Sequence, residues 1–326
     1  MPIRARHELG VLSAMLGARF SRIPDSVREN IESTLGGNPE FPDLDRIARR
    51  YREFARSRSL FRALPESRGF DDPRRWPLEG REHLDAALAG GRGAILATAH
   101  LGWWLLVAPI LRLHGYAVVQ TGGPYFDKKR RRRAAGPAGQ GSRFRRFLDE
   151  RTRAWNEYLG SDDIAVTLDI RPIFAALARN RPVLIAGDGI RSLEFAPFPL
   201  LGQPYLLLTG FMKIAMAKCC PVLPVFSLEG TRRGSIRVEI LPALSVDPTA
   251  SAVENLAGYA RVLDDQLHRT PHLWARWQTP DLFEKRRAWA AGGHFVAAWG
   301  RTRESPDPSP PGSSSETRRH RGVSWP

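Results

Sequence analysis

A single histidine, His100, stands where an uninterrupted apolar run ends, in the stretch ATAHLGWWLL (97–106). A neutral imidazole can take a proton from a hydroxyl group near pH 7, so histidine is the side chain most often used as a general base. Such a base works best when a carboxylate holds the ring in the required tautomer. His100 is therefore a candidate catalytic base. The other interpretation is a structural histidine at the beginning of a helix.

The segment that must position His100 is predicted to be a buried strand. The run GAILATA (93–99) is continuously apolar and of strand length, which is typical of a strand covered on both faces. A short helix precedes it, and a helix follows to about Leu113. Further strands are expected at 116–120, 164–168, 182–188, 221–229, 235–244 and 272–277, and further helices at 142–160, 171–180, 209–218 and 251–268.

Strands that alternate with helices predict an α/β fold, in which helices flank a mostly parallel central sheet. We expect one such domain over 71–290, preceded by a helical segment (1–70) and followed by a disordered Pro/Ser-rich tail (302–326). In the first segment, an amphipathic helix over 7–20 either lies on a membrane surface or packs on the domain. A second amphipathic, Arg-rich helix is expected over 44–63.

Two stretches of unusual composition and the two cysteines constrain the prediction further. Residues 195–212 carry no charge over a length near that of a membrane span, but prolines and a glycine interrupt them, so a buried loop-and-helix segment is expected. The basic, then Gly/Ala-rich stretch 127–142 predicts a mobile loop. Cys219 and Cys220 are adjacent, which disfavours a disulfide and gives no zinc site. We expect both to be buried and reduced.

The net charge is +15, from 49 basic and 34 acidic residues. Such an excess favours an anionic partner: nucleic acid, an anionic membrane surface or an acidic carrier protein. No base-reading or base-stacking motif accompanies the charge, so nucleic acid is not favoured. The run KKRRRR (128–133) fits either of the other two partners, or is a solvated loop.

Three phrases, in this order, carry a resemblance to a known family: LEGREHLDAALAGGRGAILATAHLGWW (78–104), GDGIRSLEFAPFPLLGQPYLLLTGFMKIAMAKCCPVLPVF (187–226) and TPHLWARWQTPDLF (270–283). The chain resembles the lipid A biosynthesis acyltransferases, part of the lysophospholipid acyltransferase superfamily, over 44–285. The resemblance implies a glycerolipid acyltransferase-like fold. It also implies transfer of a fatty acyl group from a carrier thioester to a hydroxyl of a lipid acceptor, with no metal or organic cofactor.

In that family the chemistry rests on a His-x4-Asp/Glu motif, and His100 matches its histidine. The acid is expected at position 105, where this chain has Leu105. Asp188 follows another buried strand, and the carboxyl ends of parallel strands meet at one edge of a sheet. We therefore predict that Asp188 reaches the His100 ring, with Glu194 as the alternative acid. A simple turn-forming role before Gly189 also stays open for Asp188.

The resemblance also suggests residues that bind substrate. Gly102 and Trp104 match the motif that follows the histidine, while Trp103 replaces its usual asparagine. Arg191 matches a basic residue that can hold an acceptor phosphate or a developing oxyanion, although a plain surface arginine is the other interpretation. Gly202 matches a glycine in the family's turn, where its role is conformational.

In the last phrase, Trp274, Arg276 and Trp277 match the family, while Ala275 replaces its histidine. The two tryptophans are interpreted as anchors in the core or at an interface. Neither is expected to take part in the chemistry.

These expectations give a leading function and a rival. The first is a peripheral enzyme at the cytoplasmic face of the inner membrane, with acyl carrier protein or acyl-CoA as donor and a glycolipid or lysophospholipid-like acceptor. The rival is a catalytically silent relative that binds lipid or carrier protein. Leu105 favours the rival, and the intact His100 and Gly102 favour the enzyme.

Overall fold

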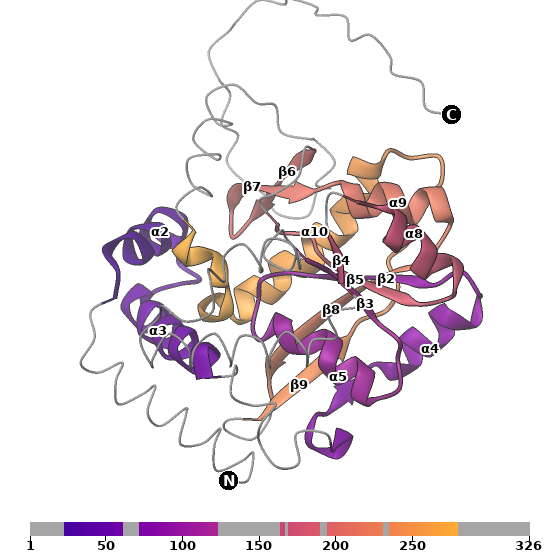
Figure 1. The fold of residues 1–326 in the computed structure, drawn as a ribbon. Coiled ribbons are helices and arrows are strands. Elements are labelled where there is room, and N and C mark those ends of the chain that lie inside the picture. Colours follow the sequence, from indigo (N-terminus) through magenta and orange to yellow (C-terminus); the bar gives the residue numbers. More distant parts are fainter. Residues whose placement is uncertain are drawn as a thin grey trace, which may run out of the picture.

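The computed structural model describes residues 23–60, 72–122, 164–166, 169–189, 194–230 and 235–279. Their centre is a seven-stranded sheet with the order β1-β9-β8-β2-β5-β3-β4 (Figure 1). Among the described pairs of this seven-stranded sheet, only β8–β9 is antiparallel, which confirms the predicted α/β fold with a mostly parallel sheet. The strands are β1 (Leu78–Glu79), β2 (Ala94–Thr98), β3 (Val119–Gly122), β4 (Ile164–Val166), β5 (Pro182–Ala186), β8 (Val222–Glu229) and β9 (Ile236–Ile240).

Helices cover both faces of the sheet. In Figure 1, α4 (Arg81–Ala89) and α5 (Val107–Leu113) lie on one side, and α8 (Arg171–Ala178), α9 (Gly210–Lys218) and α10 (Ala252–Arg269) lie on the other. The chain order explains this division, because connections between parallel strands are right-handed. The chain moves across the sheet one way from β1 to β2 and from β2 to β3, and back from β4 to β5 and from β5 to β8.

Strand β2 is the buried strand that the apolar run predicts. All five of its residues are buried, and it pairs in parallel with β5 on one side and β8 on the other. In the β2–β5 pair, Thr98 lies opposite Ala186. His100 and Asp188 each lie two residues beyond these partners, so the register places both at the carboxyl edge of adjacent strands, where α/β proteins form their sites.

Residues 195–208 correct a prediction. They form an antiparallel hairpin of β6 (Phe195–Leu200) and β7 (Gln203–Leu208), which is not the expected loop and helix, and α9 begins after it. Leu201 and Gly202 form the two-residue turn with φ values of 53° and 74°. Two successive positive φ angles are typical of the tight turn that joins twisted strands. Every second residue of β6 is buried, a period that its two prolines and its lack of charge conceal.

The expected final strand at 272–277 is also wrong. This segment forms two short 3-10 turns, η6 (Pro271–Leu273) and η7 (Ala275–Gln278). It bonds to the turn after β2 through isolated contacts: the Ala275 amide donates to the His100 carbonyl, and the Gly102 amide donates to the Leu273 carbonyl. A proline at the start of the segment and a second 3-10 turn after Trp274 prevent a continuous ladder.

Two helices near the N-terminal end of the described chain pack on this segment. They are α2 (Asp25–Leu35) and α3 (Leu44–Leu60), of which α3 matches the expected Arg-rich helix except at its end. α3 contacts η6, α2 contacts η7, and the Asn30 side chain donates to the Trp277 carbonyl at 2.7 Å. Two further 3-10 turns are η2 (Pro73–Arg75), which lies before β1, and η3 (Trp104–Leu106), which lies between the turn after β2 and α5.

Several expectations lie outside the described residues: the helix at 7–20, the loop at 127–142, the helix at 142–160 and the tail at 302–326. Within the described chain, none of the helices has the length and apolar character needed to cross a bilayer. The two cysteines differ: Cys220 is buried, but Cys219 is exposed, so the prediction is wrong for Cys219. Cys219 ends α9 with a φ of 46°, which turns it out of the helix.

Gly102 gives a test of the turn that carries His100. Its φ is 58°, and a Cβ atom here would overlap the carbonyl oxygen of Ser227. We expect Gly102→Ala to lower the free energy of unfolding by about 2–4 kcal/mol, because backbone strain and a backbone clash add. Urea unfolding measures the change. Gly37→Ala is the matched control, since Gly37 has a φ of 77° but open space around it. Equal losses in both variants would contradict the clash.

Candidate active site

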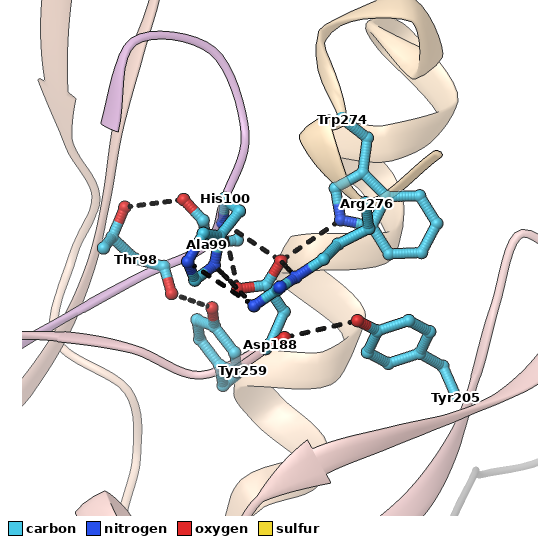
Figure 2. Close-up of polar contacts among 8 residues, drawn as sticks. All are labelled: Thr98, Ala99, His100, Asp188, Tyr205, Tyr259, Trp274 and Arg276. Carbon is cyan, nitrogen blue, oxygen red and sulfur yellow. Dashed lines mark hydrogen bonds and ion pairs between the residues drawn. The ribbon is translucent and has the colours of Figure 1, made fainter. Parts of the chain in front are cut away.

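The predicted contact between Asp188 and the His100 ring is present. Asp188 Oδ1 lies 2.7 Å from His100 Nδ1, and Figure 2 shows the carboxylate directed at the imidazole. The His100 side chain is 27% exposed while that of Asp188 is fully buried. The carboxylate therefore lies beneath a ring that reaches the surface, which is the arrangement of a buried orienting acid and an accessible base.

Several donors fix the Asp188 carboxylate. The backbone N–H of His100 donates to both oxygens, at 2.9 and 3.0 Å, and the Trp274 indole N–H donates to Oδ2 at 3.2 Å. Burial by itself raises the pKa of Asp188, but the charges of His100 and Arg276 and the hydrogen bonds from His100 outweigh burial and lower the pKa below its usual value. Asp188 is thus an ionised, acceptor-only group near pH 7.

Arg276 completes the cluster from the segment after α10. Its Nε lies 3.4 Å from Asp188 Oδ2, and its terminal nitrogen Nη2 lies 2.8 Å from His100 Nδ1 and 3.4 Å from His100 Nε2. The residue is only 7% exposed. A permanent cation is therefore held against both the carboxylate and the ring (Figure 2).

The Asp188 contact favours the ring tautomer that carries its proton on Nδ1. Nδ1 faces an ionised carboxylate oxygen at 2.7 Å, so a proton on Nδ1 is shared with that oxygen, whereas its absence would place two lone pairs against each other. A proton on Nδ1 leaves Nε2 with its lone pair. The arrangement can therefore take a proton from a hydroxyl group placed at Nε2.

Two tyrosines support the cluster through hydrogen bonds to backbone carbonyls. The Tyr259 hydroxyl, on α10, donates to the Thr98 carbonyl at 2.5 Å, and Tyr205, on β7, donates to the Asp188 carbonyl at 3.3 Å. Burial, followed by the nearby Asp188 charge, raises the pKa of Tyr259 well above its ordinary value. Tyr259 therefore stays neutral and acts as a hydrogen-bond donor that fixes the end of β2.

The other predicted site residues are placed as follows. The Trp104 ring packs on the His100 ring with centroids 5.1 Å apart, while Gly102 packs its backbone against Ser227. Glu194, the alternative acid, is bonded to Lys213 and Thr209. Gly202 lies at the tip of the β6–β7 hairpin, and Arg191 lies outside the described residues. The substrate-binding roles of these residues stay predictions.

Leu105 occupies the position of the motif acid and packs, partly buried, against the hydrophobic core. The carboxylate that meets His100 comes instead from the strand next to β2. Sequence reasoning missed Arg276 as a site residue. The available signal was its position between Trp274 and Trp277, two fully buried rings, because a charged side chain is seldom flanked by core residues unless it has a partner.

A cofactor site is not indicated by the donor set. In the described part of the chain, no group of three or more His, Cys, Asp and Glu side chains is arranged to hold a metal ion. The guanidinium of Arg276 lies against the His100 ring, and a fixed cation at this place repels a metal ion.

The model of the bacterial lipid A biosynthesis acyltransferases matches residues 1–279 of the chain. The chain belongs to this family. Its curated relatives include a phosphatidylinositol mannoside acyltransferase of Mycobacterium tuberculosis (strain ATCC 25618 / H37Rv), 29% identical over 316 residues, with 88% of this chain and 89% of the relative covered. The protein of the same name from Mycolicibacterium smegmatis (strain ATCC 700084 / mc(2)155) is 27% identical, with 86% and 88% covered. As a lipid A-type acyltransferase, the protein is an enzyme of acyl transfer, as the resemblance implies.

The segment that carries Arg276 also contains a histidine, His272, that makes the stability of the protein depend on pH. Burial, then the charge of Arg50, lowers the pKa of His272 in η6 from 6.5 to about 3. A lowered histidine pKa gives stability that is present above pH 6.5 and is lost as the pH falls toward 3. Between pH 6.5 and pH 3, we expect the free energy of unfolding of His272→Gln to fall less steeply with decreasing pH than that of the unchanged protein. The difference in slope should be up to about 1.4 kcal/mol per pH unit.

Urea unfolding at pH 7, 5 and 4 measures this effect, with His268 as a control of opposite sign. A hydrogen bond to Asp264 raises the pKa of His268, so its contribution is present below pH 6.5 and is lost as the pH rises. In His268→Gln, the free energy of unfolding should therefore fall more steeply as the pH is lowered. A His272→Gln variant with the same pH dependence as the unchanged protein would contradict the assignment.

Proposed function

We propose that the protein transfers a fatty acyl group from a carrier thioester to a hydroxyl group of a glycolipid, with His100 as general base and Asp188 as its orienting acid. The observation that carries the proposal is the 2.7 Å contact between Asp188 Oδ1 and His100 Nδ1. It supplies, from a neighbouring strand, the carboxylate that the sequence lacks at position 105.

The reaction follows from the ring proton. Nε2 of His100 takes the proton of the acceptor hydroxyl as its oxygen attacks the thioester carbonyl carbon, and Asp188 stabilises the imidazolium that forms. The C–S bond then breaks, and the imidazolium returns the proton to the thiolate. The products are an ester of the acceptor and the free carrier thiol, and the enzyme is unchanged.

The acceptor class is supported by the relatives, which are named phosphatidylinositol mannoside acyltransferases. A mannosylated phosphoinositide offers hydroxyl groups and a negatively charged phosphate. The net charge of +15 complements such an acceptor and the anionic leaflet that holds it. We accordingly propose a peripheral protein at the cytoplasmic face of the inner membrane, with acyl carrier protein or acyl-CoA as the donor.

One observation favours the silent relative that the sequence suggests: the acid at position 105 is replaced by an apolar side chain that packs on the core. The Asp188 contact answers this objection, because the carboxylate is ionised, fully buried and aimed at Nδ1. A general base requires a carboxylate at Nδ1 of an accessible ring, whereas a silent relative does not.

Acyl transfer by three forms of the protein tests the proposal. Purified protein is incubated with a labelled acyl donor, carrier protein and CoA thioesters in separate arms, and with phosphatidylinositol mannosides in vesicles. We expect His100→Ala to abolish transfer. Asp188→Asn should lower turnover by about 10²–10⁴-fold, because an amide no longer selects the productive tautomer.

Asp264→Asn is the matched control for loss of a largely buried carboxylate. Asp264 accepts from the Leu201 amide and contacts His268 on α10, and it is not part of the His100 cluster. Its variant should keep full turnover per folded molecule. Transfer that persists in His100→Ala would contradict the proposal. Absence of transfer from either donor by the unchanged protein, to these acceptors and to a total lipid extract, would favour the silent relative.

A further inference from the structure

Asp188 needs a countercharge that does not depend on the reaction. Its side chain has no exposed surface, and a buried ionised carboxylate is costly without a paired cation. His100 supplies such a charge only while its ring is protonated, and a ring that is ready to accept a proton is neutral. Among the residues that the structure describes, Arg276 is the lasting cation in contact with the carboxylate, at 3.4 Å from Oδ2.

The ring nitrogen Nδ1 lies between two groups with opposite preferences. Asp188 Oδ1, at 2.7 Å, accepts a proton from Nδ1, whereas Arg276 Nη2, at 2.8 Å, can only donate to it. The charge of the carboxylate decides between them, because an ionised Asp188, the partner at the shorter distance, favours the ring proton on Nδ1. If Asp188 took up a proton, both neighbours of Nδ1 would be donors, and the ring proton would move to Nε2, where it blocks the base.

We propose that Arg276 is a positioning residue for acyl transfer: it holds Asp188 as an ionised acceptor and thereby keeps the His100 proton on Nδ1 and the Nε2 lone pair free. The effect of Arg276 on catalysis rests on the proposed function. Its effect on the position of the ring proton does not depend on that function. Arg276 acts through Asp188 and is not assigned a contact with the substrate.

The remaining groups around the carboxylate do not replace this charge. Tyr259 from α10 stays neutral, since burial and the Asp188 charge raise its pKa well above the ordinary value. Tyr205 from β7 donates to the backbone carbonyl of Asp188 and not to its carboxylate. The Trp274 indole donates one neutral hydrogen bond. Among the described residues, loss of Arg276 therefore leaves Asp188 with dipoles alone whenever His100 is neutral.

The test reads the ring proton directly and needs no substrate. In ¹⁵N-labelled protein, multiple-bond ¹H–¹⁵N spectra at pH 7 distinguish a protonated ring nitrogen from an unprotonated one. The signals of His100, one of 8 histidines, are identified by their absence in His100→Ala. We expect the proton on Nδ1 in the unchanged protein and in Arg276→Lys, which keeps the charge. We expect it on Nε2 in Arg276→Met and Arg276→Gln.

Two neutral variants are used so that one misfolded protein does not remove the test, and folding is checked by the backbone amide spectrum. Arg237→Met is the matched control, because Arg237 is a partly buried arginine paired with Glu79 and Glu239 on the same sheet. It should leave the His100 signals unchanged. In the transfer assay, the neutral Arg276 variants should lower kcat by about 100-fold or more with little change in KM, and Arg276→Lys should restore most of it.

The outcomes separate this inference from the proposed function. A folded neutral variant that keeps the proton on Nδ1 overturns the inference, whether or not the protein is active. A raised KM with an unchanged ring proton also overturns it, since Arg276 would then bind substrate. A ring proton that moves as expected supports the inference, and if His100→Ala still transfers acyl groups, only the proposed function fails.

Discussion

The contact between Asp188 and the His100 ring is the constraint on which the described site depends. A carboxylate without exposed surface is stable only where donors and positive charge surround it, and here these come from separate parts of the chain: the His100 backbone after β2, Trp274 between η6 and η7, and Arg276 in η7. The carboxylate thus joins the carboxyl edge of the sheet to the segment after α10. In the proposed mechanism, one charge serves both the folding of the site and its chemistry.

In the proposed mechanism, the same contact accounts for Leu105 in an acyltransferase. The chemistry requires an acceptor at Nδ1, and the source of that acceptor in the sequence is immaterial if the geometry is kept. β2 and β5 are adjacent and in register. An acid two residues beyond the end of β5 therefore lies beside a histidine two residues beyond the end of β2. No carboxylate is then needed at position 105, where Leu105 packs against the core.

Much of the fold could be predicted because its signals are local. The apolar run at 93–99 gives β2, and the order of strands and helices gives the parallel sheet with adjacent carboxyl ends, from which the contact of Asp188 with His100 follows. The hairpin at 195–208 could not be predicted, because its prolines and uniform lack of charge hide the alternation of buried residues. The final strand was wrong because the Trp274 segment pairs with its neighbour only through isolated bridges.

The partners of Arg276 could not be recognised from the sequence for a related reason. Its partners lie 88 and 176 residues away, and only the three-dimensional path of η7 past the His100 turn brings it to them. A local pattern reports which face of an element is buried. It does not report which buried charge meets which, because that depends on connections between distant segments.

The most direct test of the central claim is the rate of acyl transfer by the double variant His100→Ala, Asp188→Asn, measured beside both single variants. If Asp188 acts only through the ring, its loss costs nothing further once the ring is gone, so the double variant should be as slow as His100→Ala alone. A double variant that is slower than His100→Ala by the full factor lost in Asp188→Asn would contradict the account, because the two residues would then act independently.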